Sequence, residues 1–140
     1  MMTREQAYAL RTRIENTFAL ASASMTADQV IENRALCKAW ALGVHAVGTV
    51  RSVDGYPYKC IQSHDTKEHP DIVPDSTAWP TFWIPLHGTT PETALPFVQP
   101  GYTEDRYKAG EYAIFDVGMK KCVRDTTYTY IDDPTAWEDA

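Results

Sequence analysis

Four aromatic side chains in this sequence are of a type that could hold a sugar. Proteins bind sugars by laying the apolar face of a pyranose ring on an exposed aromatic ring, while a few polar groups contact the hydroxyls. The rings not needed for a core are Tyr56, Trp83, Tyr128 and Tyr130. Tyr128 and Tyr130 are two residues apart, so in an extended stretch they share one face. That face either binds a ligand or packs against the preceding part of the chain.

Catalytic motifs are not found in the sequence. It has no Gly-x-Ser-x-Gly elbow, no phosphate-binding loop and no cysteine in a context typical of a nucleophile. The acidic pairs at 132–133 and 138–139 are chain neighbours, whereas glycosidase carboxyls face each other across a cleft. We therefore expect a non-enzymatic protein without a catalytic residue or a cofactor.

Histidines occur beside acidic residues in one stretch, where His64 and His69 follow Cys60 and alternate with Asp65 and Asp71. This spacing matches no compact zinc pattern. We expect a solvated loop there and no metal site.

Composition limits the class of protein further. The 140 residues are 44% hydrophobic and 23% charged, which predicts a folded chain of one ordinary domain or a few very small ones. The net charge of −6 and scattered lysines and arginines argue against nucleic acid or an anionic membrane as a partner. No apolar run approaches the roughly 20 residues of a membrane span. The cysteine number, three, is small and odd, which argues against a disulfide framework, so we expect reduced thiols. We expect the protein to be made in the cytoplasm.

The first third of the chain reads as a helical hairpin. Thr3 to Gln6 and Thr26 to Gln29 have the spacing of capping boxes, which predicts helices over roughly 4–22 and 27–36. Two such helices cannot bury their apolar stripes alone, so either the rest of the chain or another subunit must cover them. We assign residues 1–36 an anchoring or oligomerising role, and the apolar stripe of the first helix consists of Ala7, Leu10, Ile14 and Phe18.

An internal repeat at an offset of 62 residues follows the helices. Trp40 maps onto Tyr102, and each copy closes with Ala-Trp, at Trp79 and at Trp137. Short β-prone runs with Gly turns predict small antiparallel units pinned by aromatic rings. The matching positions are His45, Gly48, Val50 and Cys60 in the first copy and Tyr107, Gly110, Tyr112 and Cys122 in the second.

The predicted fold is therefore α+β: the helical hairpin, a first β module over 37–85, a linker over 86–96 and a second β module over 97–140. Cys60 and Cys122 should lie in two separate cores. Trp40, Trp79 and Trp137 are expected inside, and His45 is expected as a packed ring rather than a base or ligand.

The repeat resembles the small carbohydrate-binding modules of the chitin-binding type 3 class. Their signature is an aromatic, a Tyr-x-x-Gly-x-x-Val run, a Gly-x-x-Tyr strand and a Pro followed by Trp. The stretches that carry the likeness are 40–79, with the runs 45–50 and 55–60, and 107–137, with Pro134 before its closing Trp.

The order of the elements also resembles proteins of bacteriophage and prophage tail regions, in which a helical start like 2–6 precedes two such modules and a segment like 95–100 opens the second. This resemblance implies a virion-associated protein, made in the bacterial host cytoplasm, that contacts other tail or fibre proteins through its helices and host-surface polysaccharide through its modules. If the helical segment anchors by self-association, which the sequence does not demand, a trimer is expected, because tail fibres in proteins of this kind are commonly trimeric.

Two other functions fit the same residues. One is a purely structural virion component, such as a tail or capsid decoration protein, that uses the module surface for protein contacts. The other is an accessory binding module of a wall-degrading enzyme, which is the weaker alternative because such modules are usually fused to a catalytic domain.

Overall fold

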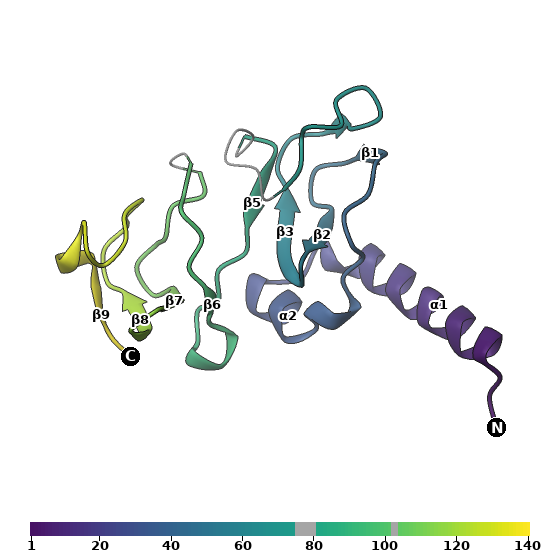
Figure 1. Ribbon diagram of the computed structural model, residues 1–140, viewed down its shortest axis with the longest axis horizontal. Helices are drawn as coiled ribbons and strands as arrows, with labels where there is room; N and C mark the ends of the chain where they lie inside the picture. The colour runs from purple at the N-terminus through teal and green to yellow at the C-terminus, as the bar shows by residue number, and fades with distance from the viewer. Residues whose placement is uncertain (75–80, 102–103) are drawn as a thin grey trace.

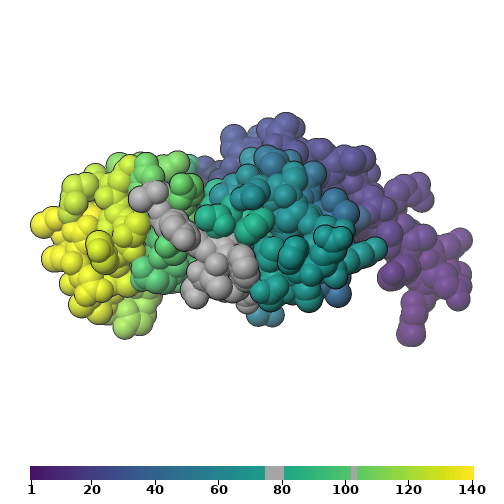
Figure 2. Space-filling model, turned by 90° about the horizontal axis from the view of Figure 1, so that it is seen from above, coloured from purple at the N-terminus to yellow at the C-terminus, as the bar shows by residue number. Residues whose placement is uncertain are grey.

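The computed structural model describes residues 1–74, 81–101 and 104–140. The chain has an α+β fold in which a helical N-terminal segment precedes two small β modules arranged along one axis (Figure 1). The space-filling view shows the modules as neighbouring lobes, with the first helix extending beyond the first module (Figure 2). The two chain ends lie at opposite ends of the molecule.

The helical segment begins as its capping signals predict. Helix α1 spans Arg4–Ser22 and α2 spans Ala27–Glu32, and both N-termini form complete capping boxes. The second helix ends earlier than the predicted residue 36, because Asn33 leaves the helical conformation with φ of −111° and ψ of 21°. A short 3-10 turn, η1, continues over Arg34–Leu36.

One core joins the helices to the first module. Of the apolar stripe on α1, only Phe18 is buried, and it packs with α2 side chains and with strand residues of the module. Residues 1–14 are exposed throughout. The buried members of this core are Phe18, Val30, Ile31, Cys37, Val50, Leu86 and Leu95.

In the described residues of the first module, five short strands form two sheets. Strands β1 (Val44–His45) and β4 (His64–Asp65) form an antiparallel pair. Strands β2 (Val50–Val53), β3 (Tyr56–Cys60) and β5 (Trp83–Pro85) form an antiparallel sheet in the order β2-β3-β5.

The second module is a single sheet in the order β6-β7-β8-β9. Its strands are β6 (Leu95–Pro96), β7 (Tyr112–Phe115), β8 (Gly118–Cys122) and β9 (Trp137–Asp139), with 3-10 turns η2 (Pro91–Thr93) and η3 (Pro134–Ala136) before β6 and β9. All pairs are antiparallel except β6 with β7, which is parallel and departs from the purely antiparallel prediction.

The structure confirms the internal repeat. Strand β2 pairs with β3 in the same register as β7 with β8, shifted by 62 residues. Each repeat cysteine closes the same backbone ring. The Cys60 carbonyl accepts the Gly48 N–H over 2.9 Å, and the Cys60 N–H donates to the Thr49 carbonyl over 2.8 Å. In the second module, the Cys122 carbonyl accepts the Gly110 N–H over 2.8 Å, and the Cys122 N–H donates to the Glu111 carbonyl over 2.7 Å.

The closing tryptophan of the first module is Trp83. It lies opposite Cys60 in the β3–β5 register, as Trp137 lies opposite Cys122 between β8 and β9. The prediction that Trp79 is the counterpart of Trp137 is wrong, because the loop before the closing strand is longer in the first module. Trp79 itself lies outside the described residues.

The first aromatic of each module also differs from the prediction. The Trp40 N–H donates to the Ser52 carbonyl over 2.8 Å, and in the second module the Phe97 N–H donates to Ile114 over 3.0 Å. Ser52 and Ile114 are 62 residues apart, so Phe97 is the counterpart of Trp40. Tyr102, which was expected there, lies outside the described residues.

Both modules have the predicted ring-filled cores. His45 is 4% exposed and meets Trp83 edge to face at 5.1 Å, and its counterpart Tyr107 meets Trp137 in the same way at 5.2 Å. The expectation of His45 as a packed ring is confirmed. Cys60 and Cys122 are buried in the two separate cores with free thiols. Burial raises the pKa of Cys122 to about 11, so its thiol stays protonated.

The segment 86–96 is folded rather than a loose linker. Leu86 and Leu95 are buried in the core shared with the helices, and β6 adds a strand to the second sheet. The Gly88 carbonyl accepts the N–H of Tyr112 over 2.9 Å. A Cβ at Gly88 would lie 2.1 Å from the Thr93 carbonyl oxygen, so only glycine fits. The two modules therefore meet through a packed junction.

Candidate functional site

The loop between β8 and β9, residues 123–133, is the part of the second module best built to present side chains. Its two ends are fixed to the module core. The Val123 N–H donates to the Ala136 carbonyl over 2.7 Å, and Thr126 exchanges two backbone hydrogen bonds with the buried Tyr107. The loop is therefore anchored beside the closing tryptophan.

Asp133 holds the loop in one conformation. Its carboxylate accepts hydrogen bonds from the Thr126 hydroxyl at 2.8 Å and from Arg124 at 2.5 Å. The Thr126 hydrogen bond, followed by the charge of Arg124, lowers the pKa of Asp133. The Asp133 N–H also donates to the Thr129 carbonyl over 2.9 Å. These contacts shape the loop without a ligand.

Tyr128 is the exposed ring of this loop. Tyr128 is 57% exposed, whereas its backbone is held by hydrogen bonds on both sides. The Tyr128 N–H donates to the Thr126 hydroxyl at 3.1 Å, and its carbonyl accepts the Trp137 indole N–H at 3.1 Å. Ile131 and Val123, 71% and 42% exposed, add apolar surface to the same loop.

Tyr130 has a supporting position. The ring is half-buried and meets Phe115 edge to face at 5.0 Å. Its hydroxyl donates to Asp116 at 3.1 Å, and the Lys120 ammonium lies 4.9 Å from the ring centroid. The prediction that Tyr128 and Tyr130 form one ring surface is therefore modified, because much of Tyr130 is already covered.

Trp83 and Tyr56 do not lie on an exposed surface. Trp83 is 1% exposed and donates its indole N–H to the His64 Nε2 at 3.1 Å, so the expectation of an exposed platform is wrong for it. Tyr56 is half-buried, and its hydroxyl donates to the Leu86 carbonyl at 3.3 Å. Both rings are needed by the first module and its junction, because the sheet is too small to be held by aliphatic side chains alone.

A cavity separate from this loop lies at the junction of the helices and the two modules. It is a cavity of about 240 Å³ that the helical segment, β3 and β5 line on one side and the second module on the other. Charged side chains of both signs surround it. They are Lys59, Glu104, Asp105, Arg106, Lys108 and Glu111.

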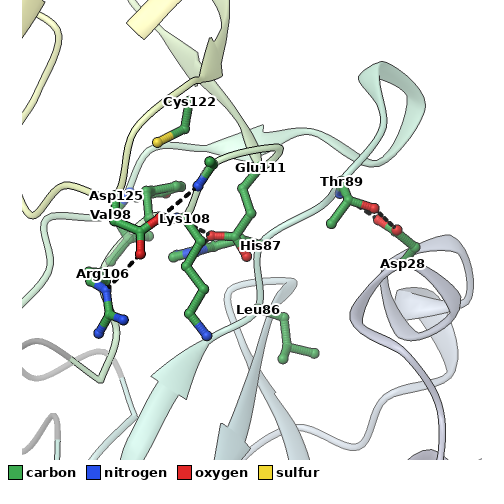
Figure 3. Close-up of polar contacts among 12 residues, drawn as sticks. Asp28, Leu86, His87, Thr89, Val98, Arg106, Lys108, Glu111, Cys122 and Asp125 are labelled. Carbon is green, nitrogen blue, oxygen red and sulfur yellow. Dashed lines mark hydrogen bonds and ion pairs between the residues drawn. The ribbon is translucent and has the colours of Figure 1, made fainter. Parts of the chain in front are cut away.

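His87 is the central side chain of this junction (Figure 3). It is 6% exposed, and its Nδ1 lies 3.0 Å from a Glu111 carboxylate oxygen that also accepts the Lys108 N–H at 2.7 Å. The His87 ring is parallel to Tyr107, with centroids 3.7 Å apart. Its Nε2 is buried and makes no hydrogen bond within the described chain. Glu111 therefore orients the imidazole, which fills the junction as a packed ring.

Asp28 fastens helix α2 to the same junction. Its carboxylate accepts the Thr89 N–H at 2.7 Å and the Thr89 hydroxyl (Figure 3). It also accepts the Thr93 hydroxyl at 2.6 Å. Burial raises the pKa of Asp28, but these hydrogen bonds outweigh that effect and lower it overall. Sequence reasoning missed both His87 and Asp28, since their partners lie 20 or more residues away.

Over residues 1–74, 81–101 and 104–140, no group of three or more His, Cys, Asp or Glu side chains is placed to hold a metal ion. His64, one of the histidines considered above, is instead engaged by Gln62 and Trp83. No helix in this described part is both long and apolar enough to cross a membrane.

Neither a family model nor a curated protein matches this chain. The class of protein therefore has to be inferred from its residues and its fold.

Proposed function

We propose that this protein is a non-enzymatic, tail-associated component of a bacteriophage virion whose second module contacts polysaccharide on the host surface. The observation that carries the proposal is the exposed ring of Tyr128 on a loop whose backbone is already fixed. A loop whose backbone is already fixed loses little conformational entropy when a sugar stacks on its exposed ring, so binding energy is retained.

The surroundings of Tyr128 support a sugar as the ligand. Ile131 and Val123 are exposed apolar side chains on the same loop, and apolar surface suits the face of a pyranose ring. The Asp133 carboxylate is occupied by internal hydrogen bonds from Arg124 and Thr126, so it is not free to bind a ligand. The helical segment supplies the attachment to other virion proteins, because α1 keeps Leu10 and Ile14 exposed.

The proposal is tested by measuring binding of the protein to intact host-type cell envelopes and to a panel of soluble polysaccharides. Tyr128→Ala should abolish saturable binding, and Tyr130→Ala should weaken it by altering the loop that Tyr130 supports. Tyr8→Ala is the matched control, since Tyr8 is 75% exposed on α1, away from the loop. Binding that survives Tyr128→Ala would contradict this site.

A purely structural virion component is the second candidate. Lys120 and Phe115 cover much of Tyr130, which leaves one well-exposed tyrosine rather than a broad ring surface. Exposed Tyr128, Ile131 and Val123 would then contact a neighbouring virion protein. This function is favoured if the wild-type protein binds no envelope or polysaccharide up to about 1 mM, where binding is worth only about 4 kcal/mol.

A further inference from the structure

The two modules differ in what covers their outer sheet face, the face opposite the ring-filled core. In the first module this face carries Val50, which is 2% exposed because Phe18, Val30 and Ile31 of the helical segment pack on it. Both α helices lie beside β2 and β3 (Figure 1). The outer face of the first sheet is therefore a helix-packing surface.

The corresponding face of the second module is formed by Tyr112, Ile114, Met119 and Lys121, and we call these four residues the outer face. Side chains alternate along a strand, so Tyr112 and Ile114 point away from Ala113 and Phe115, which pack in the core. Ile114 and Met119 are cross-strand partners, as are Tyr112 and Lys121.

Apart from Lys121, the outer face is apolar, and it is incompletely covered. Tyr112 is the counterpart of the covered Val50, yet it is half-exposed, with the Lys121 ammonium 6.0 Å from its ring centroid. Ile114, which replaces Ser52 of the first module, is 40% exposed. The second module thus has a face that corresponds to the helix-covered face of the first, is more apolar at Ile114 and has no α helix of the described chain beside it.

The same chain carries a helix with an exposed apolar stripe. Leu10 and Ile14 of α1 are 38% and 40% exposed, and Met2, Ala9 and Leu10 line a shallow apolar groove on the helix. The part of α1 that is exposed throughout, residues 4–14, is shorter than the roughly 12–15 residues below which an isolated helix is marginal in water, so packing would stabilise it. Helix α1 points away from the second module of its own chain (Figure 1). Its apolar stripe can meet an outer face only on a second copy.

Charge favours the same pairing. Helix α1 carries three arginines and two glutamates, a net charge of +1, whereas residues 97–140 carry five basic and nine acidic residues, a net charge of −4. Opposite net charges speed encounter and favour one orientation. Two α1 helices would instead bring like charges together.

We infer that α1 of one copy docks, through Leu10 and Ile14, on the outer face of the second module of another copy. This inference rests on the attachment role proposed for the helical segment and names its partner. The contact joins two different surfaces, so it is heterologous and either closes into a ring or propagates.

The test uses two variants, each with one defective surface, and sedimentation analysis of the full-length protein. Leu10→Gln with Ile14→Gln removes the stripe and retains good helix formers. Ile114→Lys places a positive charge against the basic helix. Each variant alone should be monomeric while the wild type associates, and a 1:1 mixture should form a dimer that grows no further, because only one intact pair of surfaces remains.

Leu42→Gln with Val44→Gln is the control, since these first-module residues are 56% and 75% exposed and lie outside the contact. It should assemble like the wild type. Circular dichroism establishes that each variant is folded, and Ile114→Thr serves if Ile114→Lys is not. Wild-type protein that stays monomeric up to about 1 mM, or a folded Ile114 variant that still self-associates, overturns the inference. Glycan binding depends on Tyr128 instead, so the failure of either proposal is visible separately.

Discussion

The imidazole of His87 and the phenol ring of Tyr107 lie parallel within 6°, with 3.7 Å between their centroids. His87 follows the last strand of the first module, whereas Tyr107 is the repeat counterpart of His45 in the second. One stacked pair thus joins a residue that follows the first module to the ring core of the second. We expect this pair to couple the two modules in unfolding.

His87→Ala should lower the free energy of unfolding by about 3 kcal/mol, because it removes a buried ring and leaves a cavity at the junction. His87→Phe keeps the stack and should cost much less. Urea unfolding followed by both tryptophan fluorescence and circular dichroism measures this. Equal losses in the two variants would show that the Glu111 contact, not the stack, holds the junction.

Asp28→Asn should destabilise the protein at neutral pH by about 1.5 kcal/mol, the lower end for hydrogen bonds to a charged group, because Asp28 is partly exposed. The pKa of Asp28 is lowered in the folded state, so its contribution is present above the ordinary value of 3.8 and is lost as the pH falls through the folded-state pKa. The difference from wild type should therefore shrink between about pH 6 and about pH 3.

Glu32→Gln is the control for this experiment, since it changes a carboxylate on the same helix that is exposed. It should leave stability within about 0.5 kcal/mol of the wild type at both pH values. A loss at Asp28 that does not change with pH would mean that the carboxylate charge is not what binds the two threonines.

His45 should make the first module sensitive to mild acid. Burial lowers the pKa of His45; its Nε2 lies 3.0 Å from the Ala41 carbonyl, and its Nδ1 is buried without a partner in the described structure. The unfolded chain therefore binds a proton more readily below the ordinary value of 6.5, and stability falls as the pH decreases through that value.

When the pH is lowered from about 7.5 to about 5, the free energy of unfolding of His45→Phe should fall less than that of the wild type, whatever the variant's stability at the higher pH. Denaturant unfolding at the two pH values gives the comparison. The nearby charges that act on His45 are those of His64, Arg51 and Asp65. An unchanged pH dependence in His45→Phe would assign the acid sensitivity to one of the other histidines.

Trp83→Ala and Trp137→Ala should each cost about 3–5 kcal/mol, because each removes the largest ring of a small core. Tyr128→Ala should change stability by no more than about 0.5 kcal/mol. Thermal unfolding of the three variants tests the equivalence of the two tryptophans. A mild effect of Trp83→Ala beside a severe effect of Trp137→Ala would contradict it.

Local signals explain what the sequence could predict. Two capping boxes define where α1 and α2 begin, and both bonds of each box lie within three residues. The strand frame was predictable at an offset of 62 because Cys60 and Cys122 and the glycines before them occupy matching places in it.

The wrong assignments arise where loop lengths differ between the modules. Matching sequence letters paired Trp79 with Trp137 and Trp40 with Tyr102, whereas backbone pairing assigns Trp83 and Phe97 to those places. Strand register is decided by hydrogen bonds between distant segments, which a single sequence does not display. The same reason hid the junction, where Asp28 meets Thr89 across 61 positions.

The candidate loop was only partly predictable. Alternation of Tyr128 and Tyr130 drew attention to this loop, but it could not reveal that Phe115 and Lys120 cover one ring and leave the other exposed. Exposure depends on neighbours from β7 and β8, so it follows from packing rather than from spacing.

The pairing of cysteine with tryptophan is the same in both modules, whereas the length of the chain between the two residues differs. Trp83 follows Cys60 by 23 positions and Trp137 follows Cys122 by 15, although both pairs meet in the same register. Eight residues were thus gained or lost between the copies without altering the frame, because the ring-filled core holds both ends of the loop. Such a frame can exchange one loop for another, and a foreign peptide grafted between the two anchors should leave the fold of the module intact.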